Sequence, residues 1–213
     1  MCSGHPNTVS IDPSIRIEGY IIRSRSSIGQ SEAGWWLTGA QRVAVAHVAR
    51  AACGGTRHRG QSIDDATADV AAFIAATPAH TTGDQVGSWV LALGEGPYVE
   101  VVGVVARTVA VDTLHRTLGL AVPAIPDPQP GMPRREPVKT KRGRAWVGMA
   151  GFEVPPNTLS GSPSEQAAAN QLEAGFYMTG EQMQNPDQHR GRLHRTQIEL
   201  VAASLSHANE CFY

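Results

Sequence analysis

The sequence is short of cysteine, of aromatic residues and of net charge. Its three cysteines, Cys2, Cys53 and Cys211, are too few and too scattered for a disulfide framework. A formal charge of -1 gives no reason to expect nucleic acid or a membrane surface as a partner. No run of 18 apolar residues occurs, and the first residues, MCSGHPNTVS, contain no apolar signal region. These absences predict a cytoplasmic protein that binds neither nucleic acid nor membranes.

Alanine and valine are abundant, whereas aromatic residues account for only 6% of the chain. This composition favours helices packed through small side chains over a sandwich of aromatic-rich strands. Thr38 and Ser62 are candidate N-caps, and Gly54 and Pro78 follow the respective apolar stretches. A further N-cap is expected at Ser162 or Ser164. The segments that we expect to be helical are 38–53, 62–77, 84–93, 97–119, 162–180 and 195–208.

The segment 97–119 is rich in Val-Val pairs, which are also typical of a strand. We predict a helix, because about 20 residues without a turn signal are too many for a usual strand. Glu100 near its start and Arg116 near its end also suit the helix dipole.

A change of composition divides the chain. The stretch AVPAIPDPQPGMPRREPVKTKRGRAW combines many prolines with a basic run. Prolines at this density are incompatible with a helix or a central strand. We therefore expect a flexible arm at 1–33, a first helical half at 34–120, a linker at 121–144 and a second helical half at 145–213. The predicted fold is all-α, an antiparallel helical bundle of two related halves joined by this proline-rich linker.

Two helices that lead to a cysteine suggest a weak internal repeat. Gln41 precedes Cys53 by twelve residues, and Glu199 precedes Cys211 by the same number. A duplicated helical unit, of which the first copy has lost its acid, would explain the match. Chance is the alternative, because alanine and valine are common throughout.

The terminal segment RTQIELVAASLSHANECFY carries the most chemically suggestive residues. Glu199 and Ser206 are seven residues apart and share a helix face, and Asn209 suits the left-handed turn that ends a helix. Cys211 would then lie at the N-terminus of whatever follows, where its pKa falls, and Glu199 could accept its proton. The alternative is ordinary packing, since a lone cysteine is usually a small buried hydrophobe and a lone glutamate is usually solvated.

This segment resembles the signature of the alkylhydroperoxidase D and carboxymuconolactone decarboxylase superfamily. That signature runs Glu, eleven residues, Cys, two residues, Cys, three residues, His, often with Asn-x-Cys-x-Tyr-Cys at the bend. Glu199, Asn209, Cys211 and Tyr213 match it position by position. The upstream stretches YVEVVGVVARTVAVDTLHRTLGL, PDPQPGMPRREP and AWV are similar to longer members of the family, so the resemblance extends from about Leu37 onward.

The resemblance implies thiol-dependent peroxide reduction, in which the second cysteine attacks the peroxide and the first closes a disulfide. Cys211 would be the resolving thiol and Glu199 the proton-relay acid, with no cofactor and no metal. The sequence ends at Tyr213, before the second cysteine and the histidine. We therefore expect the parent reading frame to continue with Cys directly after Tyr213 and His four residues later. The resemblance also implies a homo-oligomer, a trimer or hexamer, and a small peroxide or lactone acid as substrate.

Cys53 is expected to be structural. Thr56 takes the place of a second cysteine, and Gln41 cannot accept a proton, although Arg57, His58 and Arg59 would lower the pKa of Cys53 if they converged on it.

Other motifs are weaker. His47, Cys53 and His58 lack the spacing of a zinc site, and the glycines of GEGPYVE lack a dinucleotide fingerprint. The run KTKRGR is expected to be a solvated linker, and HRGRLHR is either a basic rim for an anionic substrate or a plain loop.

Two classes of function remain open from the sequence. The first is an enzyme of the peroxidase or decarboxylase-like group. The second is a non-catalytic helical protein that uses its helices for oligomerisation and its cysteines for packing. Under either, Leu200 and Leu205 would need a partner for their apolar faces.

Overall fold

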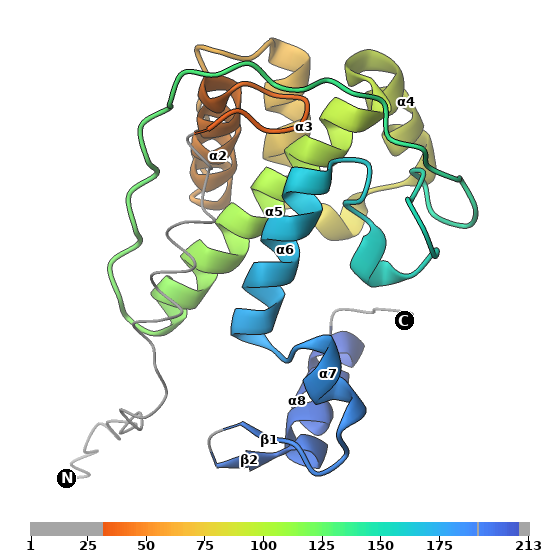
Figure 1. The fold of residues 1–213 in the computed structure, drawn as a ribbon. Helices are drawn as coiled ribbons and strands as arrows, with labels where there is room; N and C mark the ends of the chain where they lie inside the picture. Colours follow the sequence, from red (N-terminus) through yellow and green to blue (C-terminus); the bar gives the residue numbers. More distant parts are fainter. Residues whose placement is uncertain (1–31, 191, 209–213) are drawn as a thin grey trace, which may run out of the picture. The chain divides into compact units, whose positions relative to one another are not determined.

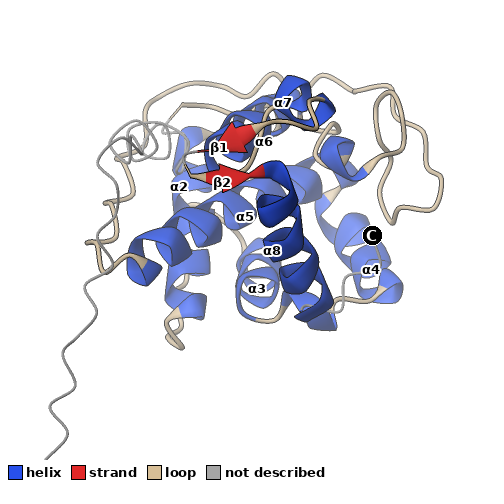
Figure 2. Cartoon of the chain, turned by 90° about the horizontal axis from the view of Figure 1, so that it is seen from below, coloured by secondary structure: helices blue, strands red, loops and turns tan. Residues whose placement is uncertain are grey.

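The computed structural model describes residues 32–190 and 192–208, so most of the arm expected at 1–33 lies outside the described residues. These residues divide into two compact units, 32–177 and 178–208, each of which is described by itself. The all-α prediction is confirmed, because helices predominate and the strands of the described ranges form one short hairpin (Figure 2). The boundary between the two units falls after Tyr177 in the chain, whereas the sequence predicts a boundary at the linker 121–144.

Helix α2 spans Gly39–Cys53 and begins as predicted. Thr38 accepts a hydrogen bond from the backbone N–H of Gln41, and the Gln41 side chain accepts from the Thr38 N–H, so both ends of a capping box are present. Gly54 ends the helix. One face of α2, including Val45 and Val48, is buried.

Helix α3 spans Asp65–Ala76, and its N-cap is Asp64, so the prediction of Ser62 as the cap is wrong. The Asp64 carboxylate accepts a hydrogen bond from the Thr67 N–H at 2.7 Å, and a carboxylate at this place also suits the helix dipole. A single 3-10 turn, η1, follows at Pro78–His80. Helix α4 spans Gly83–Leu93 and starts with a second capping box, made by Thr82 and Gln85.

Helix α5 spans Glu95–Thr117, which confirms helix over strand for the valine-rich segment. It starts two residues before Pro97, because Gly94 adopts φ 85°, a value that favours glycine, and lets the chain turn directly from α4 into α5. Helix α5 contacts α2, α3, α4 and α6. Its valines are therefore buried around much of its circumference, which explains their abundance.

Helix α6 spans Pro163–Phe176 and is preceded by a 3-10 turn, η2, at Pro155–Asn157. Ser162 is the residue at the N-cap, but its hydroxyl makes no capping bond, because it donates to Glu100 instead. Figure 1 shows α6 beside α5, and the two helices are in contact.

The proline-rich connector between α5 and η2 has no helix or strand of its own but is anchored along its length. The Pro123 carbonyl accepts a hydrogen bond from Arg50 of α2 at 2.9 Å, and the Glu136 carbonyl accepts one from the Trp35 indole at 2.8 Å. In Figure 1 this green segment leaves α5, passes outside α2 and crosses to the side of α4. The connector is therefore attached to the helices of the 32–177 unit.

The second unit contains α7 at Gly180–Gln184, β1 at His189–Arg190, β2 at Leu193–His194 and α8 at Arg195–Ala208. The bounds predicted for the terminal helix are confirmed. The segment NPDQHRGRLHR, expected as a loop, contains the β1–β2 hairpin, in which His189 pairs with His194. The sequence signals did not predict α7.

Helices α2 and α8, the two arms of the expected repeat, differ in their surroundings. Thr38 caps α2, whereas Thr196 lies inside α8, and α8 has no buried residue among those described. Duplication of the unit therefore stays a prediction.

Within residues 32–190 and 192–208, no single helix is long and apolar enough to cross a membrane. Helices α4 and α5 reach that length and composition only as a pair, across a bend of 114°.

Gly103 of α5 provides the first testable prediction. A β-carbon there would lie 2.6 Å from Glu165 Oε2 and 2.9 Å from the Cβ and Cγ of Glu165. We expect Gly103→Ala to lower the free energy of unfolding by about 1–3 kcal/mol, because overpacking outweighs the better helix propensity of alanine. Gly87→Ala in α4 is the matched control. It meets no atom within 4 Å and should stabilise the protein by about 0.5–1 kcal/mol in the same urea titration. Equal stabilisation by both changes would contradict the packing described here.

Candidate functional site

The predicted proton-relay acid, Glu199, lies in the middle of α8. Its side chain is 44% exposed and forms an ion pair of 3.2 Å with Arg195, one turn earlier on the helix. Cys211, Asn209 and Tyr213 lie outside the described residues. The structure therefore places Glu199 but does not test its proximity to Cys211.

Helix α8 presents an apolar stripe to its surroundings. Ile198, Val201 and Leu205 follow one another at spacings of three and four residues and so share a face, and Val201 and Leu205 are 55% and 59% exposed. Leu200 is also exposed. None of the described side chains of α8 is buried. The apolar stripe is therefore available for contact with an apolar partner.

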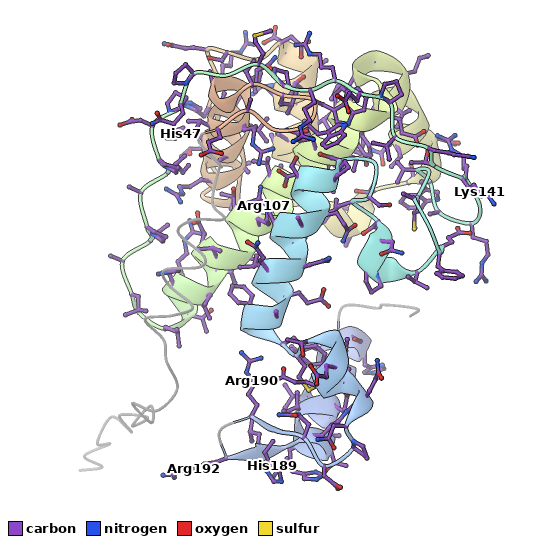
Figure 3. All side chains as sticks on the ribbon, viewed as in Figure 1. His47, Arg107, Lys141, His189, Arg190 and Arg192 are labelled. Carbon is purple, nitrogen blue, oxygen red and sulfur yellow. The ribbon has the colours of Figure 1, made fainter. Side chains whose placement is uncertain are left out.

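The basic hairpin of this unit uses its two histidines for packing. The rings of His189 and His194 meet edge to face, with their centroids 4.8 Å apart, across β1 and β2. Figure 3 labels His189, Arg190 and Arg192 on this hairpin. The His189–His194 contact gives part of the segment HRGRLHR a structural role.

Cys53 is the last residue of α2, and its surroundings do not activate its thiol as a nucleophile. Its Sγ donates a hydrogen bond to the Ala75 carbonyl at 3.2 Å. Partial burial of the thiol raises the pKa of Cys53; Arg116 lowers that pKa, and Asp112 raises it further. A higher pKa means less thiolate at neutral pH, which agrees with the structural role expected from the sequence.

The three basic residues after Cys53 do not converge on its sulfur. Arg57 faces Asp69 at 3.9 Å and Arg59 faces Asp65 at 3.6 Å, both as exposed pairs. His58 contacts His47, with ring centroids 5.7 Å apart. Burial lowers the pKa of His47, and the neighbouring His58 and Arg50 lower it further. Within the part of the chain that the structure describes, no group of three or more His, Cys, Asp or Glu side chains is arranged to hold a metal ion.

The most unusual feature of the 32–177 unit is a cluster of four buried charges, which we call the charge network. Its members are Arg42 of α2, Glu100 and Arg107 of α5, and Glu165 of α6. Each is at most 2% exposed. Figure 3 shows Arg107 on α5 near α6. Two positive and two negative side chains leave the network without net charge.

Glu100 ties the segment before α2 to the helices. Its carboxylate accepts hydrogen bonds from Arg42 Nη1 at 2.6 Å, from the Trp36 N–H at 2.7 Å and from the Ser162 hydroxyl at 3.0 Å, with a longer one from the Leu37 N–H. Its oxygens are therefore used within the protein. Such a carboxylate holds structure and has no lone pair directed at a substrate.

Glu165 completes the network from α6. Arg107 donates to it from Nε at 3.0 Å and from Nη2 at 2.7 Å, and Arg42 Nη2 forms a further ion pair with its other oxygen. Burial lowers the pKa of Arg107, and Glu165 offsets part of that effect. Burial also disfavours charge on Arg42, but Glu165 and Glu100 outweigh it and raise the pKa of Arg42. Both guanidinium groups remain charged.

The sequence contains one signal of this network. Glu100 suits the helix dipole, but the helix around it is apolar on several faces. Charged residues in the interior of such a helix need partners, and Glu100 and Arg107 are seven residues apart, on one face. The partners come from residues about 60 positions away, which no local pattern identifies.

A cleft of about 360 Å³ lies next to the network. Trp36 and Leu37, whose N–H groups bind Glu100, form part of its wall. Helices α4 and α5 contribute Leu93, Pro97 and Val101. The polar lining consists of Gln41, Asp64, Thr67 and Arg135. The lining combines apolar side chains with somewhat more polar surface, so polar groups are available to fix the orientation of a small ligand.

Comparison with known proteins adds no identification. The chain matches no protein-family model, no curated protein and no solved structure.

Cys53 provides the second testable prediction. In the variant with Cys2→Ser and Cys211→Ser, we expect the Cys53 thiol to react with a disulfide reagent more slowly in the folded protein than in urea. The reason is that its raised pKa leaves less thiolate, so the midpoint of the rate-against-pH profile should lie above that of the unfolded chain. A folded-state midpoint below the unfolded one would mean that Cys53 is an activated thiol.

Proposed function

We propose that this chain is an alkylhydroperoxidase D-like protein in which Glu199 and Cys211 belong to a thiol-dependent peroxide-reducing site. The observation that supports the proposal best is the setting of Glu199. It lies on a confirmed helix twelve residues before Cys211, half exposed, with its carboxylate paired only to Arg195 among the described residues. A carboxylate in such a setting remains accessible for proton exchange.

The proposed chemistry needs a second cysteine as the attacking thiol. Its thiolate attacks the peroxide oxygen; the O–O bond breaks, an alcohol leaves with a proton, and the sulfur becomes a sulfenic acid. The Cys211 thiolate then attacks that sulfur, a disulfide forms and water leaves. Glu199 accepts the thiol proton and returns it to the leaving oxygen. An external dithiol restores both thiols.

The exposed stripe of α8 favours a second candidate function, self-association without catalysis. Val201, Leu205 and the neighbouring Leu200 would be covered by another copy or by a following helix. The homo-oligomer implied by the resemblance is part of this proposal. The two candidates differ in one respect: only the first requires a reactive pair of thiols.

The proposed site provides the third testable prediction. The 213-residue chain should show negligible turnover of hydrogen peroxide or an alkyl hydroperoxide with dithiothreitol as donor, because Cys211 has no cysteine at Cys-x-x-Cys spacing. Turnover by this chain that disappears with Cys211→Ser would show that the roles are misassigned.

The same assay on the reading frame continued past Tyr213 tests the roles directly. Cys211→Ser should abolish turnover, and Glu199→Gln should lower it by about 100-fold, as expected for loss of a general acid–base. Cys53→Ser is the matched control and should leave turnover unchanged. A frame that encodes no cysteine after Tyr213, or a Glu199→Gln variant with full activity, would overturn the proposal.

A further inference from the structure

The cleft beside the charge network has walls that are fixed before any ligand arrives. The Trp36 indole N–H donates to the Gly161 carbonyl at 2.9 Å. Its ring packs so closely on α5 that a β-carbon at Gly96 would lie 2.2 Å from it. The backbone of Trp36 and Leu37 is held by Glu100. A rigid aromatic wall of this kind lowers the entropy lost on binding a small molecule.

Opposite charges line the cleft without pairing to each other. Arg135 comes from the connector and Asp64 from the start of α3, and no ion pair joins them within the described residues. Asp64 accepts hydrogen bonds from Thr67, which lower its pKa and keep it ionised at neutral pH. The guanidinium group of Arg135 supplies the positive charge. One cation and one anion on the same cleft are complementary to a ligand that carries both charges.

Arg135 is held at the cleft by a strained backbone. Its φ of 53° lies in the left-handed region, which residues with a β-carbon rarely adopt. Its N–H donates to the Trp35 carbonyl at 2.7 Å, and this bond fixes the turn. Strain of this kind concentrates where a side chain must be aimed for function.

Gln41 adds a second donor on the cleft. Its Oε1 is used by the capping box with Thr38. Its Nε2 makes no hydrogen bond to the described residues and belongs to a side chain that lines the cleft. A carboxylate accepts well from a guanidinium and an amide together.

We propose that this cleft binds a free α-amino acid with a large apolar side chain. Arg135 and Gln41 take its carboxylate, and Asp64 takes its ammonium group. The side chain packs against Trp36, Leu93 and Pro97, the partly exposed apolar residues of the lining. The volume of about 360 Å³ is at the lower end of the range for small-molecule sites, which suits a ligand of this size.

The fourth prediction tests this cleft by calorimetric titration of the 213-residue chain with L-phenylalanine. We expect saturable binding that moves the NMR signals of the Gln41 side-chain amide and the Trp36 indole. 3-Phenylpropanoate, which lacks the ammonium group, and phenethylamine, which lacks the carboxylate, should each bind at least about tenfold more weakly, because each loses one charge-assisted contact.

Variants with matched controls identify the residues. Arg135→Gln and Asp64→Asn should each weaken L-phenylalanine binding at least about tenfold, and asparagine preserves the helix cap. Arg134→Gln and Asp65→Asn should not change it, because Arg134 stacks on Trp35 instead and neither residue lines the cleft. Absence of binding up to about 10 mM, equal binding of the two analogues, or insensitivity to Arg135→Gln and Asp64→Asn would each overturn the proposal.

Discussion

Two arginines and two glutamates meet in the interior of the 32–177 unit and join four stretches of chain. Glu100 holds the backbone of Trp36 and Leu37, Arg42 brings α2 to the same point, and Glu165 brings α6. Burying charges costs several kcal/mol per ion, so the cluster forms only if every carboxylate is fully bonded. The network joins α2, α5 and α6 at one point, whereas α3 and α4 pack on their neighbours without contributing a charge to it.

The network also explains features that are otherwise unrelated. Gly34 and Gly103 lie so close to its carboxylates that a β-carbon at either position would collide with them. Ser162 gives up helix capping in order to donate to Glu100. The segment whose N–H groups bind Glu100 also forms a wall of the cleft. Part of the cleft wall is thus held in place by the buried charges, and a change in the network is expected to alter that wall as well.

Local signals in the sequence were sufficient for most of the helices. Thr38 with Gln41 marks the start of α2, and the long valine-rich run is a helix because it contains no turn signal. The N-cap of α3 was predicted wrongly because two suitable residues, Ser62 and Asp64, lie close together. Asp64 is the one whose side chain accepts a hydrogen bond from the Thr67 N–H. The β1–β2 hairpin was missed because only two residue pairs define it, too few for a periodic pattern.

The functional residues were harder to predict from the sequence than the helices. The sequence predicts Glu199 and Cys211 as catalytic residues, and the structure describes only Glu199. The charge network was not predicted, because its ion pairs join residues that are 58 or, for Arg42 and Glu165, 123 positions apart in the chain. Such pairings depend on tertiary packing, and composition alone could not identify them. The cleft has the same origin, since its lining comes from α2, α4, α5, the start of α3 and the connector.

The most direct test of the central claim compares two glutamates on α6. The account predicts that Glu165→Gln lowers the free energy of unfolding by about 3–5 kcal/mol, because Arg42 and Arg107 lose a buried partner. The exposed Glu173→Gln should change it by less than about 0.5 kcal/mol in the same denaturant titration. A loss below about 1 kcal/mol for Glu165→Gln, with an unchanged dependence on denaturant, would contradict the claim that the buried charges hold this unit together.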